Sequence, residues 1–289
     1  MTAHRQPYGV IVCSAATLLI LAAAVAGCKV PPKMAPSVVA QAAALIESGE
    51  DLFLAQLMLE AALQADSALE EGWYHRGLLF DYENQVDEAD SCFGRALRLN
   101  AVHRPTLFAR GQMRLREGDF AGAMSDFSEI TVFYPRLPDG YQGRAWVFDD
   151  LGRTEEAIRE WGQAIRVSPD DAMLYQERGF ARLDAGRAEQ AAEDFTRALA
   201  LDSALSRSYA GRGEARYELG LFSLALSDCD SAIFLDDGDA DAWLTRGRAA
   251  DYSGQFEVAV SSYRRFLRLV SPSDADVADV EKRLAQLDR

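Results

Sequence analysis

The sequence predicts an all-α fold, a solenoid of about seven helix-turn-helix repeats closed by a C-terminal capping helix. The first observation is a 34-residue period in the arginines, at Arg76, Arg110, Arg144, Arg178, Arg212 and Arg246. The second is that glycine follows all but one of these arginines, and alanine recurs 13 residues after each of them. Such periods are typical of stacked repeats, in which each helix pair buries its apolar face against the next pair.

Within one period, small and large residues alternate as a closely packed helix pair requires. A large residue follows the recurrent alanine by four positions, as at Phe93 and Trp161, and a second small residue follows three later, as at Ala96 and Ala164. Turn glycines lie midway, at Gly118, Gly152, Gly186, Gly220 and Gly254. The pattern resembles the tetratricopeptide repeat family, whose 34-residue unit is a pair of antiparallel helices. The resemblance implies a right-handed superhelical solenoid without β-strands.

In this frame the repeat domain covers residues 36–273 without an insertion. The repeats are 36–69, 70–103, 104–137, 138–171, 172–205, 206–239 and 240–273. The first repeat is degenerate, which is typical of a terminal repeat. Residues 274–289 are expected to form the capping helix, because apolar residues fall on one face at Val277, Val280, Leu284 and Leu287.

The N-terminal segment, residues 1–27, has the pattern of a signal peptide. Arg5 is its only charged side chain, and residues 10–27 form an uncharged, largely apolar run. The run ends in Val-Ala-Gly before Cys28, which resembles the lipobox of bacterial lipoproteins. The resemblance implies cleavage before Cys28 and acylation of its thiol, with residues 28–35 as a lipidated N-terminus and proline-rich tether. An uncleaved anchor and a signal cut elsewhere are the alternatives.

Acylation of Cys28 would make the protein an exported one, tethered to the cell envelope by several acyl chains. In proteobacterial lipoproteins an aspartate after the cysteine favours inner-membrane retention, and Lys29 stands at that position here. The resemblance therefore implies the periplasmic face of the outer membrane, in a cell that has two membranes.

The composition disfavours several functional classes. Without residues 1–27, the chain has 29 lysines and arginines against 45 aspartates and glutamates, so its surface repels nucleic acid and anionic lipid. The repeat domain has two cysteines, Cys92 and Cys229, and two histidines, His75 and His103. The cysteines lie too far apart in the array for a disulfide, and two histidines are too few for a histidine-rich metal site. We expect no metal, no small-molecule cofactor and no nucleic-acid partner.

The recurrent arginines are expected to be structural. Acidic residues recur sixteen positions after four of them, at Asp126, Glu160, Asp194 and Asp228. We therefore expect a ladder of partly buried arginine–carboxylate pairs, in preference to a stripe that binds phosphates or carboxylates. The sequence has no glycine-rich phosphate loop and places no nucleophile beside a base, so the chain is not expected to be an enzyme.

The resemblance implies that a partner binds in a concave groove lined by the first helix of each repeat. Carried over position by position, the groove has twelve acidic residues against three basic ones, with aromatic residues among them. The candidate partner-binding residues are Tyr74, Asp81, Phe108, Gln142, Trp146, Asp149, Asp150, Gln176, Phe180, Asp184, Glu214, Tyr217, Glu218 and Arg248. They predict a protein or peptide partner with basic and apolar residues. A purely solubilising role for the acids is the alternative.

Three functions are compatible with these features. The favoured one is a membrane-anchored scaffold or adaptor that binds proteins through the acidic, aromatic-lined groove. The second is a structural component of an envelope secretion, pilus or polysaccharide-export assembly, bound through the convex face or the repeat ends. The third is an enzyme with a carboxylate site such as Asp149 and Asp150, although adjacent residues on a helix point about 100° apart, a poor geometry for an acid/base pair.

Overall fold

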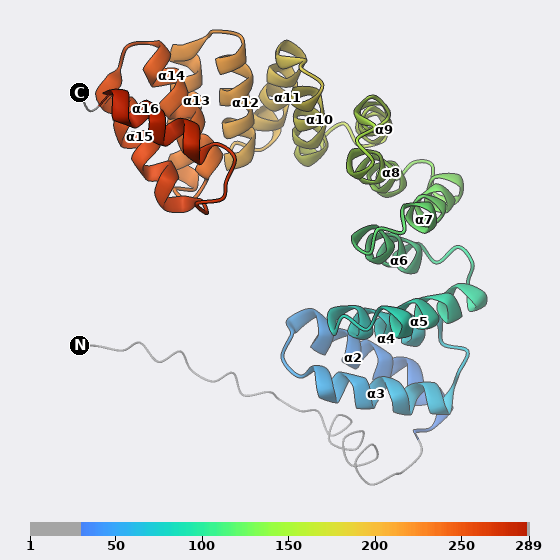
Figure 1. The fold of residues 1–289 in the computed structure, drawn as a ribbon. Coiled ribbons are helices and arrows are strands. Elements are labelled where there is room, and N and C mark those ends of the chain that lie inside the picture. The colour runs from blue at the N-terminus through green and yellow to red at the C-terminus, as the bar shows by residue number, and fades with distance from the viewer. Residues whose placement is uncertain (1–29, 288–289) are drawn as a thin grey trace, which may run out of the picture. The chain divides into compact units, whose positions relative to one another are not determined.

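The computed structural model describes residues 30–287, and every regular element within them is a helix. The all-α fold predicted from the sequence is confirmed. Fifteen α-helices follow a short 3-10 helix, η1 (Pro32–Met34), in this part of the chain (Figure 1). Their bounds are α2 (Ala35–Ser48), α3 (Leu52–Ala65), α4 (Glu70–Tyr82), α5 (Val86–Leu99), α6 (Arg104–Arg116), α7 (Phe120–Phe133), α8 (Asp139–Asp150), α9 (Thr154–Val167), α10 (Ala172–Asp184), α11 (Ala188–Leu201), α12 (Ser206–Glu218), α13 (Phe222–Leu235), α14 (Ala240–Tyr252), α15 (Phe256–Leu269) and α16 (Val277–Leu287).

Consecutive helices associate in pairs, each joined by a short turn. α2 packs on α3, α4 on α5, α8 on α9, α10 on α11, α12 on α13 and α14 on α15, and side-chain hydrogen bonds join α6 to α7. The second helix of a pair also packs on the first helix of the next pair, as α11 does on α12 and α13 on α14. The described residues divide into two compact units, and the division falls between Ile130 and Thr131.

The turn inside each pair requires a left-handed backbone conformation, which glycine adopts without strain. Gly49 and the five turn glycines predicted from the sequence have φ values between 66° and 76°. In the second pair, Asn84 takes this position with φ of 59°. Asparagine tolerates the left-handed region better than other residues with side chains, so the turn forms where the sequence shows no glycine.

The glycine that follows all but one of the recurrent arginines allows the two helices of a pair to touch. A Cβ atom on Gly77 would lie 2.5 Å from Phe93 Cε1, and one on Gly179 would lie 2.8 Å from Phe195 Cε1. Phe93 and Phe195 are fully buried. Because a close-packed interior leaves no room for an added methyl group, the spacing of glycine and large residue follows from packing.

At the C-terminal end of the second unit, α16 packs against α15 (Figure 1). Val277, Val280 and Leu284 are buried together with Tyr263 and Phe266 of α15. The final helix thus covers the apolar face of the last pair, as its apolar stripe indicates.

The described residues begin at residue 30, so the expected signal peptide and Cys28 lie outside them. Within the segment predicted to be a proline-rich tether, Pro32–Met34 form a 3-10 helix, and Val30 is buried against the first helix pair. Apolar burial of Val30 and Ala35 holds this segment on the domain. Within residues 30–287, no helix is both long and apolar enough to cross a bilayer.

Candidate functional site

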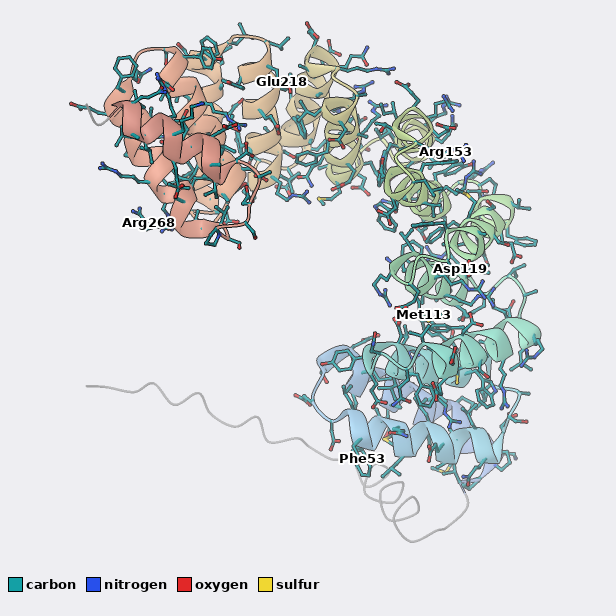
Figure 2. The ribbon with its side chains drawn as sticks, viewed as in Figure 1. Phe53, Met113, Asp119, Arg153, Glu218 and Arg268 are labelled. Atoms are coloured by element: carbon teal, nitrogen blue, oxygen red, sulfur yellow. The ribbon has the colours of Figure 1, made fainter. Side chains whose placement is uncertain are left out.

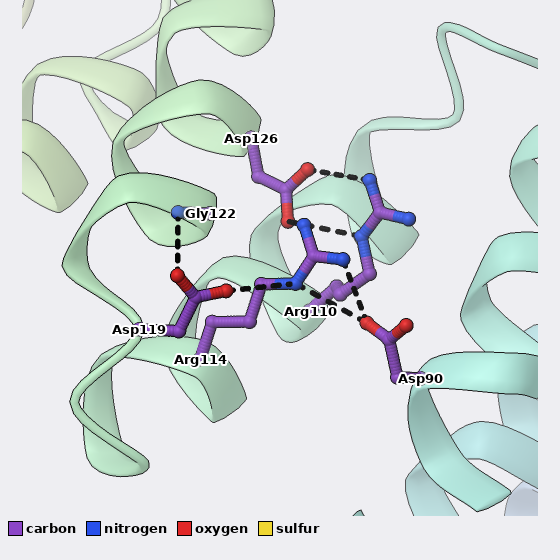
Figure 3. A network of polar contacts seen from close by, with 6 residues as sticks. All are labelled: Asp90, Arg110, Arg114, Asp119, Gly122 and Asp126. Carbon is purple, nitrogen blue, oxygen red and sulfur yellow. Dashed lines mark hydrogen bonds and ion pairs between the residues drawn. The ribbon is translucent and has the colours of Figure 1, made fainter. Parts of the chain in front are cut away.

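The recurrent arginines form the expected ladder of ion pairs between the two helices of a pair. Asp126 of α7 accepts hydrogen bonds from Arg110 Nε at 2.9 Å and Nη2 at 2.5 Å, and from Arg114 Nη1 at 3.0 Å (Figure 3). Its carboxylate is buried but fully engaged, which is the requirement for a charge inside a protein. The same arrangement joins Arg178 and Arg182 to Asp194, and Arg212 and Arg216 to Asp228. These groups are structural.

Three pairs depart from the full arrangement. In the second pair Cys92 stands at the carboxylate position. Within the described residues the one ion pair of Arg76 is with Glu60 Oε1 at 3.7 Å, its guanidinium lies over the rings of Trp73 and Phe80, and its Nε is buried without a hydrogen-bond partner. In the fourth pair Arg144 Nη2 donates to Glu160 Oε1 at 2.5 Å, as expected, but Arg144 Nε and Glu160 Oε2 are buried without a partner. In the seventh pair Ser262 Oγ accepts a hydrogen bond from Arg246 Nη1 at 2.8 Å. The ladder is therefore incomplete at Cys92.

The candidate residues of the second unit lie on the first helices of four pairs, α8, α10, α12 and α14. We call this surface the acidic face, and it carries Asp149, Asp150, Glu177, Asp184, Glu214, Glu218 and Asp241. Glu218, at the C-terminal end of α12, is labelled in Figure 2. The arginines of the same helix positions are Arg207 and Arg248, and Arg248 forms an ion pair with Asp276, outside the face. The acidic face therefore carries seven acidic residues beside these two arginines.

The Asp149 carboxyl has a strongly perturbed proton affinity. Partial burial raises its pKa to about 6, and the nearby charges of Asp184, Glu177 and Asp150 act in the same direction. Trp161 Nε1 donates a hydrogen bond to Asp149 Oδ2 at 3.2 Å, which opposes the shift. Solvent still reaches Asp149 from the open side, so the cation of a partner has access to it.

A hollow of about 250 Å³ opens between α10, α12 and α14. Its lining consists of Phe180, Arg207, Ala210, Gly211, Glu214, Asp236, Asp239, Asp241 and Thr245. Partial burial raises the pKa of Glu214, and the charge of Glu218 raises it further. Partial burial and the charge of Asp239 raise the pKa of Asp241 in the same way. Protein atoms surround these carboxyls on several sides while solvent reaches them from the opening.

Aromatic side chains flank the carboxylates. Trp146 packs edge-on against Trp161, with ring centroids 6.2 Å apart. The rings of Phe222 and Tyr252 stack with their centroids 5.3 Å apart and an interplanar angle of 17°. The ring centroid of Tyr217 lies 5.8 Å from that of Tyr252. Because Tyr252 is 70% exposed, this aromatic group is open to an apolar partner.

One candidate on α10 is engaged within the protein. Gln176 is only 2% exposed. Its Oε1 accepts from Ser208 Oγ at 2.9 Å, and its Nε2 donates to Glu177 Oε1 at 3.2 Å. Gln176, a candidate partner-binding residue, is therefore not open to a partner, because the neighbouring helix α12 covers its amide. Gln142 of α8 is half-buried. Phe180 packs edge-on against Phe195 of α11, with ring centroids 4.9 Å apart.

The candidates of the first unit are held by contacts inside that unit. Asp81 accepts hydrogen bonds from Arg116 Nη2 at 2.5 and 2.7 Å. The ring centroids of Tyr74 and His103 lie 5.6 Å apart. Phe108 packs edge-on against the buried Phe127 of α7, with ring centroids 5.9 Å apart. Because the Asp81 charge is balanced by Arg116, this unit offers a weaker attraction to a basic partner than the acidic face does.

Five polar residues that line the hollow are not among the candidates selected from the sequence: Arg207, Asp236, Asp239, Asp241 and Thr245. The signal was present, since Arg207 and Asp241 occupy the same repeat position 34 residues apart, and Thr245 lies four residues further on. Phe222 was missed for another reason. It begins α13, a second helix, and the repeat positions used to select the candidates come from first helices alone.

Residues 30–287 contain no group of three or more histidine, cysteine or acidic side chains placed to hold a metal ion. Burial raises the pKa of the Cys229 thiol to about 12 and also raises that of Cys92. Both thiols are therefore protonated at neutral pH, which makes them poor nucleophiles.

Comparison with protein families matches the chain to one described as tetratricopeptide repeat, over residues 74–138, 143–204 and 177–240. These segments make up more than half of the chain. No curated protein matches it.

Solved structures share the fold. A tetratricopeptide repeat protein from Parabacteroides merdae is 14% identical, with a TM-score of 0.62, over 89% of this chain and 100% of that one. The C-terminal part of a repeat protein from Cytophaga hutchinsonii is 16% identical, with a TM-score of 0.65, over 84% and 98% of the two chains. YrrB, described as a TPR protein with an unusual peptide-binding site, is 18% identical, with a TM-score of 0.54, over 66% and 98%. At these identities the likeness shows the fold alone.

Proposed function

Because the chain belongs to the tetratricopeptide repeat family, we propose that it is a protein-interaction scaffold whose acidic face binds a basic, partly apolar segment of a partner protein. The observation that carries the proposal is the set of unpaired carboxylates on this face. Asp184, Glu214 and Asp241 form no ion pair within the described residues, whereas the buried aspartates of the ladder each bind two arginines. A charge left unpaired in a partly enclosed surface is stabilised by a cation from outside.

The aromatic side chains beside these carboxylates fit the same partner. Lysine and arginine carry apolar stems below their charged groups, so they bury hydrocarbon against rings while their charges meet carboxylates. Trp146 and Tyr252 provide such rings on α8 and α14. YrrB carries a peptide-binding site on a related fold, which supports the choice of a peptide segment as the ligand.

Selection from a displayed library of random peptides tests the proposal. The native full chain should enrich peptides rich in arginine and lysine, with aromatic or aliphatic neighbours. A variant carrying Asp149→Asn, Asp184→Asn and Glu214→Gln should lose this enrichment, because it removes three negative charges from the acidic face at nearly constant side-chain size.

The matched control carries Glu189→Gln, Glu193→Gln and Glu257→Gln. These three glutamates are exposed on the second helices α11 and α15, so the control changes the net charge by the same amount outside the acidic face. It should keep the native enrichment. Equal loss in both variants would show that only overall charge matters, and enrichment of acidic or neutral peptides by the native chain would overturn the proposal.

We also propose, from the sequence pattern alone, that the chain is exported and anchored to the cell envelope by acylation of Cys28. Its place at the end of an apolar run, after Val-Ala-Gly, supports this, and Lys29 favours the periplasmic face of the outer membrane. Metabolic labelling with a fatty-acid analogue should mark the native chain and not a Cys28→Ser variant. Equal labelling of both would refute acylation at this cysteine. A scaffold of this kind needs no catalytic activity or cofactor.

A further inference from the structure

We infer that the hollow between α10, α12 and α14 receives the guanidinium group of an arginine in the partner segment, and that Arg207 occupies its mouth in the free protein. This inference rests on the proposed function, since it names the side chain that one part of the acidic face would recognise. It goes further in assigning to one of the chain's own arginines the role of a competitor.

The position of Arg207 shows what the hollow attracts. Its guanidinium carbon lies 4.9 Å from the centroid of the Phe180 ring, and its Nη1 lies 4.0 Å from Glu177 Oε1. A planar cation over an aromatic face, beside a carboxylate, is a favourable arrangement for arginine in particular. The chain itself therefore supplies an example of the ligand group.

The interior of the hollow offers hydrogen-bond acceptors that Arg207 does not use. The carboxylates of Glu214 and Asp241 have no hydrogen-bond or ion-pair partner within the described residues. Thr245 also lines the hollow, is 7% exposed, and its hydroxyl has no hydrogen-bond partner there. A guanidinium carries five N–H donors in a fixed fork, which suits two carboxylates and a hydroxyl better than the three donors of lysine do.

The charge balance leaves the hollow short of cations. Glu214, Asp236, Asp239 and Asp241 face a single basic residue, Arg207, among the lining residues. Asp239 is partly engaged, because its side chain caps the backbone N–H of Ala242 at 3.0 Å. A second cation therefore enters an environment that is still negative after Arg207 is counted.

Arg207 is held weakly enough to be displaced. Its side chain is 64% exposed, and its ion pair with Glu177 is at the 4.0 Å limit of such contacts. Exposed ion pairs and exposed cation–π contacts each contribute little to stability. A partner arginine that reaches Glu214 and Thr245 gains contacts that Arg207 lacks, so exchange favours the partner.

Titration of the full chain with three small probes, followed by NMR of the Thr245 methyl group, tests the inference. The probes are N-acetyl-arginine amide, N-acetyl-lysine amide and N-acetyl-citrulline amide, the last a neutral isostere of arginine. We expect saturable shifts of Thr245 with the arginine probe, weaker binding of lysine and none of citrulline. Equal binding of lysine, or binding of citrulline, would overturn the assignment to a guanidinium.

The variant Arg207→Ala gives the sharpest result. Removing the competitor should tighten binding of the arginine probe about fivefold, since about 1 kcal/mol of internal contacts no longer has to be broken. Arg197→Ala is the matched control, because Arg197 makes the same two kinds of contact outside the hollow. Its guanidinium carbon lies 5.8 Å from the centroid of the Tyr175 ring, and its Nη2 lies 3.9 Å from Asp170 Oδ1. If Arg197→Ala tightens binding as much, the effect is only net charge and the competitor role is wrong. Weaker binding in Arg207→Ala would also refute it.

Glu214→Gln and Thr245→Val should each weaken the arginine probe by about fivefold or more, while Glu189→Gln leaves it unchanged. Circular dichroism of each variant shows whether the fold is kept. If library selection still yields basic peptides that depend on Asp149 and Asp184 but the hollow variants have no effect, the inference fails and the proposed function stands. If no basic peptide is selected, the proposed function itself fails.

Discussion

The buried ion-pair ladder predicts a large cost for neutralising one of its carboxylates. Asp194 is 4% exposed and accepts from Arg178 Nε at 2.8 Å and Nη2 at 2.7 Å, with Arg182 Nη1 at 2.6 Å. The variant Asp194→Asn keeps the size of the side chain but leaves two guanidinium groups without a counter-charge. Breaking a buried ion pair by removing one partner costs about 3–5 kcal/mol.

The lower end of that range applies here. Both arginine side chains remain 18% exposed, so water can compensate part of the lost interaction. We therefore expect a loss of about 3 kcal/mol in the free energy of unfolding for Asp194→Asn. A variant with methionine at Arg178, Arg182 and Asp194 should lose less than Asp194→Asn alone, because it removes the buried charges together.

Urea denaturation followed by circular dichroism measures these differences, with equal m-values as the check that the transitions are comparable. Asp170→Asn is the control, since Asp170 is 89% exposed and lies 3.9 Å from Arg197. It should change stability by no more than about 0.5 kcal/mol. A loss below about 1 kcal/mol for Asp194→Asn, or a larger loss for the methionine variant, would refute the reasoning on buried charge.

Three further predictions concern other parts of the chain. Cys92→Asp restores the missing carboxylate beside Arg76 and should raise the free energy of unfolding by about 1 kcal/mol, whereas Cys92→Asn should not, as urea denaturation would show. Gly77→Ala should destabilise by about 1–3 kcal/mol because its Cβ would lie 2.5 Å from a buried ring, while Gly94→Ala, with its nearest atom at 3.7 Å, should stabilise by about 0.5 kcal/mol. The same loss in both alanine variants would contradict the packing argument. The pKa of Asp149, raised to about 6, means that its carboxylate is protonated as pH falls from 7 to 5, so a basic peptide should bind more weakly at pH 5, and Asp149→Asn should flatten this dependence. The free energy of unfolding should change with pH in the opposite direction to peptide binding. Ionisation of the partly buried Asp149 lowers the free energy of unfolding as pH rises through about 6. The variant Asp149→Asn should not show this loss.

Much of the fold was predictable because the residues that pack the helices together recur every 34 positions. The arginine at one position and the acid sixteen residues later predict the pairs of Arg110 with Asp126 and of Arg178 with Asp194, and both are observed. The second arginine of each group, such as Arg114, was not predicted. This second arginine recurs in only some repeats. Whether it contacts the same carboxylate as the first arginine depends on how far its side chain extends.

The candidate site was less predictable, because repeat position gives the face of a helix but not the partners of a side chain. Glu214 and Gln176 both occupy first-helix positions. Glu214 is open to solvent in a hollow, while Gln176 is covered by Ser208 of the next pair. A periodic pattern cannot distinguish these two outcomes, since they depend on the local fit between neighbouring helices.

The most direct test of the central claim is photo-crosslinking in living cells. A photoreactive phenylalanine analogue placed at Gln142, Asp184 or Glu218 lies on the acidic face, and at Glu189 or Glu257 it lies on second helices. Binding of a partner segment on the acidic face predicts adducts from the first three positions, with the crosslinked peptide rich in lysine and arginine, and none from the other two. Adducts from the second helices alone, or a crosslinked segment that is acidic, would contradict the proposed function.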